Sequence, residues 1–130
     1  MRECKTRLAL TDGYIDDYGH VNYLNVPKIY ELGWDAILAE GGYSLLSIEE
    51  KYGIRSFVKK LEIGYLAELF ENDEVVVTTR IDFGNTSMIF DQYIERGQQV
   101  VSRQKIVMVA VDSQGNKTPL PTELKEAFKG

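Results

Sequence analysis

The sequence predicts an α+β fold in which one antiparallel β-sheet curls around a single long helix. Two observations carry this prediction. The segment over residues 25–39 is helical in pattern and apolar around most of its circumference, and such a helix is covered on several sides. After residue 60 the chain alternates between apolar and polar residues, and short Gly- and Asn-containing turns interrupt it, which favours antiparallel neighbours.

The first elements are a strand, a polar turn and two helices. We expect them, in order, over residues 7–14, 16–20 and 25–39, with the second helix starting at a capping box over 47–50. Asn25 can cap the long helix, and Pro27 is tolerated in its first turn because that N–H has no intrahelical partner to lose. Gly41 and Gly42 are typical of a helix end.

Four strands are expected in the rest of the chain. They extend over 60–65, 74–83, 88–95 and 100–111, and the first two alternate between apolar and polar residues. We expect short hairpins to link them and Thr122 to cap a short terminal helix after Pro121. No repeat or linker interrupts this order, so the sequence predicts one domain over residues 1–130. The outer face and the edges of such a sheet need cover, which favours a homodimer.

Composition and charge exclude several classes of function. The chain has 130 residues, with 15 Lys and Arg against 20 Asp and Glu, a net charge of −5 that argues against binding nucleic acid. His20 is the single histidine, so multi-histidine metal sites are excluded, and Cys4 has no cysteine partner. No apolar run approaches the roughly 20 residues that span a membrane, and a cytoplasmic protein is expected.

One dense group of polar residues precedes the long helix, over residues 16–22. It places carboxylates upstream of a helix N-terminus, where free N–H groups stabilise negative charge. Gly19 allows a tight turn or a close approach to a ligand, and His20 is the residue type most often used for acid–base chemistry. The group could hold a carbonyl oxygen on backbone N–H groups while a carboxylate handles water. It could equally be a solvated turn that caps a helix, since Asp, Gly and Asn are ordinary turn formers.

The run Asp-Asp-Tyr-Gly-His-Val-Asn over 16–22 resembles the signature Asp-x-x-Gly-His-Val-Asn of hotdog-fold acyl-CoA thioesterases of the 4-hydroxybenzoyl-CoA thioesterase family. The resemblance covers essentially the whole chain. Weaker matches follow in the family's order, at Glu31, 63–65, 73–76, 84–87 and Pro121. The sequence departs from the family pattern at Tyr23, where many relatives have a second Asn, and over 24–27, which leaves the register of the helix start open.

This resemblance implies an enzyme that hydrolyses an acyl-CoA thioester. Asp16 would be the catalytic carboxylate, as general base or nucleophile, with Asp17 as its competitor. The backbone N–H of Tyr23, or that of a residue close by, would stabilise the oxyanion. The residues expected to bind substrate or shape its site are Gly19, His20, Asn22, Glu31, Thr86 and Ser87. The reaction requires no metal and no cofactor. The expected partners are the acyl-CoA substrate, or an acyl carrier protein in its place, and other copies of the chain in a homodimer or homotetramer.

Three other classes of function stay open at the level of sequence, one of which is a purely structural interaction domain. A non-catalytic hotdog protein would bind acyl-CoA as a sensor or accessory subunit, although such a protein has no use for Asp16 beside the thioester. A hotdog hydratase or dehydratase would use a histidine with a nearby carboxylate, and His20 lies in a different local pattern. Release of thiol from an acyl-CoA distinguishes the thioesterase from all three.

Overall fold

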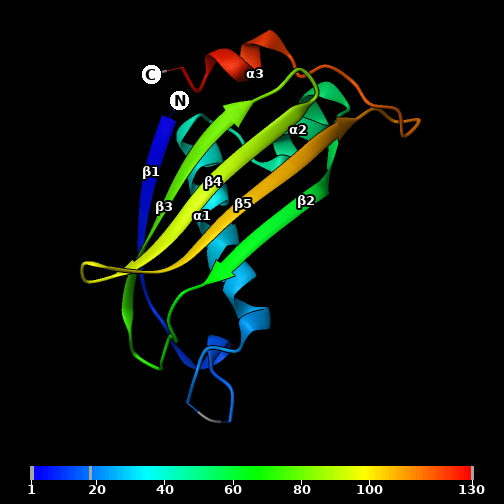
Figure 1. Cartoon of the computed structure of the whole chain (residues 1–130). Helices are drawn as coiled ribbons and strands as arrows, with labels where there is room; N and C mark the ends of the chain where they lie inside the picture. Colours follow the sequence, from blue (N-terminus) through cyan, green and yellow to red (C-terminus); the bar gives the residue numbers. More distant parts are fainter. Residues whose placement is uncertain (1, 18, 130) are drawn as a thin grey trace.

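The structure is a computed structural model that describes residues 2–17 and 19–129, with Asp12 described by its backbone alone. A five-stranded antiparallel sheet packs against one long helix, which confirms the predicted α+β class (Figure 1). The elements are β1 (Arg2–Ala9), α1 (Val26–Glu40), α2 (Leu45–Tyr52), β2 (Arg55–Tyr65), β3 (Glu74–Phe83), β4 (Ser87–Arg96), β5 (Gln99–Val111) and α3 (Thr122–Glu126). Short 3-10 turns at Asp12–Tyr14 and Tyr23–Asn25 lie between β1 and α1.

The strand order in the sheet is β1-β3-β4-β5-β2. The expected hairpins β3–β4 and β4–β5 are confirmed. A hairpin between the strand at 60–65 and the one at 74–83 was wrong, because β2 pairs with β5 and forms the far edge of the sheet. The connection over 66–73 is longer than a tight turn and crosses one end of the sheet instead. Alternation along a strand specifies its faces but not its neighbour.

Two boundaries near the start of the chain also differ from the prediction. The first strand covers Arg2–Ala9 rather than 7–14, since it pairs residue by residue with β3 from Ile81 to Glu74. The capping box of the second helix lies at Ser44 and Ser47 rather than over 47–50. The Ser47 N–H donates to Ser44 Oγ (3.0 Å) and the Ser44 N–H donates to Ser47 Oγ (2.8 Å).

Helix α1 lies over β1 and β3, with a lesser contact to β4. Its buried positions share one face and are Val26, Ile29, Tyr30, Gly33, Ile37 and Leu38. Gly33 permits this close approach, since a Cβ at that position would overlap Thr79 Oγ1 and lie 2.8 Å from Gln92 Nε2. In a single chain the sheet therefore covers one side of α1, and Leu32 on another side is 39% exposed.

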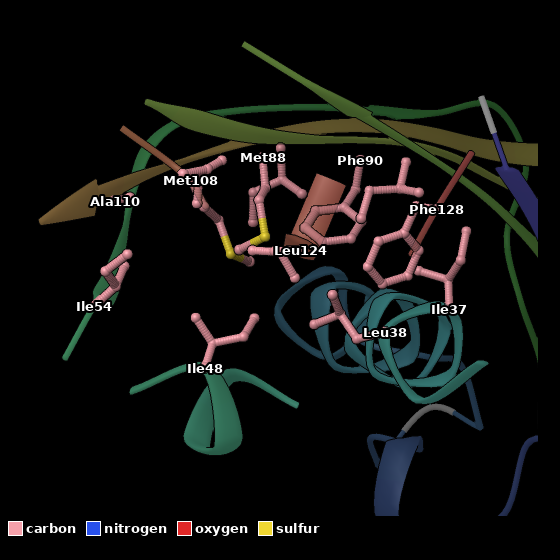
Figure 2. Packing of buried hydrophobic residues seen from close by; sticks show 13 residues of the cluster. Ile37, Leu38, Ile48, Ile54, Met88, Phe90, Met108, Ala110, Leu124 and Phe128 are labelled. Atoms are coloured by element: carbon pink, nitrogen blue, oxygen red, sulfur yellow. The ribbon is translucent and has the colours of Figure 1, made fainter. Parts of the chain in front are cut away.

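The apolar core has two clusters, one toward each end of α1. Figure 2 shows the first, in which Ile37 and Leu38 of α1 meet Phe90 of β4 and Met108 of β5, with Ile48 of α2 closing one side. Leu124 and Phe128, from α3 and the residues after it, complete the cluster. The second cluster surrounds the start of α1 and contains Leu10, Val26, Ile29, Tyr30, Leu69, Val75, Val77, Ile94 and Val101. This second cluster anchors the helix start and the polar loop before it.

Edge strand β2 is not covered by α1. Apolar side chains along it stay exposed, among them Val58 at 52%, Leu61 at 44% and Tyr65 at 46%. Alternation and register place these three on the inner side of the sheet, the side on which α1 lies. An uncovered apolar strip next to a helix is a site for a ligand or a second chain. Among the described residues, no helix is both long enough and apolar enough to cross a bilayer.

Candidate active site

The predicted polar run forms a closed turn at one end of the sheet, at the bottom of Figure 1. An isolated bridge between Ile15 and Val21 closes it. The Asp16 N–H donates to the His20 carbonyl (2.8 Å), and the His20 N–H donates to Asp16 Oδ1 (3.1 Å). Gly19 has φ +77°, a conformation that favours glycine, and its N–H donates to the Asp16 carbonyl (3.1 Å). The turn thus fixes the direction of the Asp16 carboxylate. Tyr18 lies outside the described residues.

The chain passes from this turn into α1 through a cap at Asn22. Asn22 Oδ1 accepts a hydrogen bond from the Leu24 N–H (2.9 Å), which starts the 3-10 turn at Tyr23–Asn25. Tyr23 is the first residue of that turn, where a backbone N–H has no partner within the helix. Asn25 was expected to cap α1, but it makes no side-chain cap bond, and its amide donates to the Tyr14 carbonyl instead (3.1 Å).

The connection over 66–73 supports the turn from the other side. The Val21 N–H donates to the Leu69 carbonyl (2.8 Å), and His20 forms a bridge with Phe70. The two rings meet edge to face with their centroids 4.9 Å apart. His20 Nδ1 lies 3.6 Å from Glu68 Oε1. The imidazole is therefore held by this connection, and its backbone N–H is the group that contacts the catalytic candidate Asp16.

A hollow of about 320 Å³ opens beside Tyr23. Val26 at the start of α1, Leu69 in the connection and Ser102 on β5 contribute to its walls. Tyr65, at the end of β2, closes one side, because its hydroxyl donates to the Tyr23 carbonyl (3.0 Å) and the two rings meet nearly at right angles. At the level of sequence, Tyr65 was included only in the weak family match over 63–65 and was assigned no role in the site, since the end of an alternating strand does not by itself indicate a ligand.

A second hollow, of about 270 Å³, lies further along the same side of α1. It lies between α1 and the strands β2 and β5. Its lining is Pro27, Lys28, Glu31 and Trp34 on α1, Val58 and Leu61 on β2, and Gln104 and Ile106 on β5. Both hollows are lined by the first half of α1 together with residues of β2 and β5, so the two follow one seam between α1 and β2. Glu31 thus borders the seam and does not join the Asp16 turn.

The structure brings most, but not all, of the predicted site residues together. Asp16, Gly19, His20, Asn22 and Tyr23 form one turn that leads into α1. Asp16 is half-buried, whereas its competitor Asp17 is exposed. The turn containing Thr86 and Ser87 lies at the other end of the sheet, between β3 and β4 (Figure 1).

Within one chain Thr86 and Ser87 therefore do not meet Asp16. The Thr86 carbonyl accepts a hydrogen bond from the Ala110 N–H there (2.7 Å). In the part of the chain that the structure describes, no three His, Cys, Asp or Glu side chains gather as metal ligands do.

Residues 10–128 match the model of the thioesterase-like superfamily. The chain belongs to this superfamily. The family resemblance of the polar run is thereby confirmed, and so is the class of enzyme it implied, a thioester hydrolase, at the level of the superfamily. No match was found among curated proteins.

Solved structures of thioesterases share the fold of this superfamily member. A 1,4-dihydroxy-2-naphthoyl-CoA thioesterase from Synechocystis superposes with a TM-score of 0.89 at 17% identity, over 97% of this chain and 95% of that one. A mutant 4-hydroxybenzoyl-CoA thioesterase complexed with 4-hydroxybenzoyl-CoA gives 0.88 at 15%, over 99% and 100%. A gentisyl-coenzyme A thioesterase gives 0.84 at 20%, over 97% and 100%. These likenesses confirm the hotdog fold.

Proposed function

We propose that this chain is an acyl-CoA thioesterase that converts an acyl-CoA and water to a free acid and CoA. The observation that carries the proposal is the position of Asp16. Its carboxylate is oriented by the turn that leads directly into the helical N–H groups at Tyr23, within the region matched by the thioesterase-like superfamily. A carboxylate and an oxyanion site are the two groups that hydrolysis of an already electrophilic thioester needs.

In the proposed reaction the thioester carbonyl lies at the hollow beside Tyr23, with its oxygen on the Tyr23 N–H. The start of α1 adds the positive end of the helix dipole. One such donor is worth roughly 10²–10³ in kcat, because it stabilises the charge that develops on the oxygen. Asp16 either takes a proton from the attacking water or attacks the carbonyl itself and forms a mixed anhydride. In both routes CoA leaves as a thiolate, which needs no strong acid.

The neighbouring residues serve to hold these two groups in place. The backbone N–H of His20 fixes one oxygen of Asp16, and Gly19 supplies the left-handed turn that makes this bond possible. Asn22 fixes the Leu24 N–H and so the first turn after Tyr23. We assign these three residues to positioning the thioester site, and Glu31 to the rim of the seam along which the substrate extends.

We further propose that two chains pair through edge strand β2. Val58, Leu61 and Tyr65 leave an apolar strip along that edge. An antiparallel, two-fold pairing of β2 with its copy would bring the β3–β4 end of one sheet next to the Asp16 end of the other. Thr86 and Ser87 of one chain would then complete the site of its partner, a role they cannot fill within their own chain. A homotetramer would be built from two such pairs.

Thiol release from a panel of thioesters tests the proposed function. The panel contains short, long and aromatic acyl-CoA substrates, together with one of these acyl groups on an acyl carrier protein. We expect release from at least one acyl-CoA, by a protein whose mass in solution is two or four times that of one chain. Binding of acyl-CoA without release of thiol would replace the enzyme with a sensor. Hydration of an enoyl-CoA without release would identify a hydratase.

A second prediction concerns Tyr65, which holds the oxyanion donor through the Tyr23 carbonyl. Tyr65→Phe keeps the ring contact with Tyr23 and removes only this bond, so we expect kcat to fall about threefold to tenfold with KM unchanged. The amide resonance of Tyr23 should also shift, which NMR would measure. Tyr93→Phe, on the outer face of β4, is the matched control. An unchanged kcat and an unchanged amide would contradict the positioning role.

A further inference from the structure

A chain of buried polar side chains connects α1 to the middle of the sheet. Gln92 Nε2 donates to the Tyr30 carbonyl and to Thr79 Oγ1, both at 2.9 Å. Gln104 Nε2 in turn donates to Gln92 Oε1 (3.0 Å). Thr79 is fully buried, and Gln92 and Gln104 are 3% and 5% exposed. These residues occupy positions that the alternation of β3, β4 and β5 assigns to the inner face of the sheet.

The Tyr30 carbonyl sets the direction of every hydrogen bond in this series of side chains. The Tyr30 main-chain carbonyl can only accept, so Gln92 must present its NH₂ group to it. Gln92 Oε1 then faces Gln104 and requires a donor, which is the NH₂ group of Gln104. The side-chain oxygen of Gln104 ends this series and receives no hydrogen bond from it. Gln104 Oε1 is buried and has no hydrogen-bond partner among the described residues.

This leftover acceptor belongs to a residue that lines the second hollow of the seam. Gln104 points to the inner face, since Arg103 and Lys105 on either side of it are exposed. The apolar residues of the same lining include Trp34, Leu61 and Ile106. The charged groups of the lining, Lys28 and Glu31, are exposed and lie on the α1 side. A buried amide oxygen without a donor is unfavourable in such surroundings, and a donor on a bound molecule would satisfy it.

We propose that Gln104 determines acyl specificity by accepting a hydrogen bond from a hydroxyl or N–H donor on the acyl group of the substrate. The inference rests on the proposed function. The apolar walls fit an apolar body, and the single acceptor fits one neutral donor on that body. Because the hollow continues the seam from the Tyr23 site, a thioester held there can extend its acyl group to Gln104. A substrate without the donor leaves the buried oxygen unpaired and is disfavoured.

Matched substrates isolate the hydrogen bond. Benzoyl-CoA has no donor, its 3-hydroxy and 4-hydroxy derivatives have one, and the 4-methoxy derivative keeps the oxygen without the proton. We expect the wild-type kcat/KM to favour one hydroxy derivative over both benzoyl-CoA and the methoxy derivative by at least about tenfold. Gln104→Met removes the acceptor at similar volume, and this preference should fall to within about twofold. Gln99→Met, an exposed glutamine of the same strand, should leave the preference unchanged.

Three results would overturn the proposal. If Gln104→Met lowered kcat/KM equally for all four substrates, the donor would belong to the pantetheine arm, which they share. A changed mass in solution for Gln104→Met would assign it to a second chain. No preference for a donor in the wild type would remove the basis of the proposal. Calorimetric binding of the free acids to the wild-type protein measures the same preference without turnover. It therefore decides the matter even if Gln104→Met fails to fold or if the protein hydrolyses none of the thioesters.

Discussion

Asp16→Asn is expected to lower kcat for thioester hydrolysis by about 10²–10⁴, with little change in KM. The amide neither takes a proton from water nor attacks the carbonyl. It keeps an oxygen that accepts the His20 N–H, so the turn and the start of α1 retain their geometry. Thiol release under saturating substrate measures the effect, and thermal unfolding verifies that the variant is folded.

Asp17→Asn is the matched control for this substitution. Asp17 is exposed and directly adjacent in sequence, so its loss changes the local charge by the same amount without removing the proposed catalyst. We expect the control to keep kcat within about twofold. Equal activity of wild type and Asp16→Asn would contradict the assignment, and loss of activity in Asp17→Asn alone would move the role to Asp17.

A single turnover in ¹⁸O-labelled water separates the two roles of Asp16. A general base directs water to the acyl carbon, so the label enters the free acid at once. A nucleophile first forms a mixed anhydride, and water that attacks the Asp16 side of it leaves the label on the enzyme. Mass spectrometry of the peptide containing Asp16 would detect that label. A labelled peptide establishes the nucleophilic route.

Local patterns in the sequence predicted the helix and the central strands because both patterns arise from burial. Alternation over 74–83 corresponds to β3 residue by residue, and the predicted helix differs from α1 by one residue at each end. The first strand was misplaced because its inward side is weakly apolar, with Thr6 between Cys4 and Leu8, and charged residues separate them. The position of β2 at the far edge depends on pairing between distant segments, which a local pattern does not contain.

The candidate site likewise has one part that a local pattern predicted and another part that it did not. The turn from Asp16 to Asn22 is contiguous, so a short motif was sufficient to predict it. The two hollows combine α1 with the ends and middles of β2 and β5, and no motif connects those segments. One signal was present in the sequence, since Gln92 and Gln104 occupy apolar positions of their strands. A polar residue at such a position indicates a buried partner or a ligand.

Gly33→Ala is expected to destabilise the protein by about 2 kcal/mol or more, the usual cost of overpacking a core. The added Cβ would overlap Thr79 Oγ1 and lie 2.8 Å from Gln92 Nε2 and 2.9 Å from Val77 Cγ1. Relief requires α1 to move away from β3, or the bonds of Gln92 to break. Alanine favours a helix interior over glycine by only about 1 kcal/mol, which does not offset these costs. Chemical denaturation would measure the loss.

Gly64→Ala is the matched control, because its Cβ would meet only the Arg103 carbonyl, at 4.0 Å, an ordinary contact. We expect this variant to unfold within about 0.5 kcal/mol of the wild type. The contrast between the two substitutions separates the close approach of α1 to the sheet from any general effect of replacing glycine. If Gly33→Ala were as stable as the control, α1 would have to lie further from β3 than these distances imply. The hydrogen bond from Gln92 to the Tyr30 carbonyl, and with it the orientation of Gln104, would then lose its support.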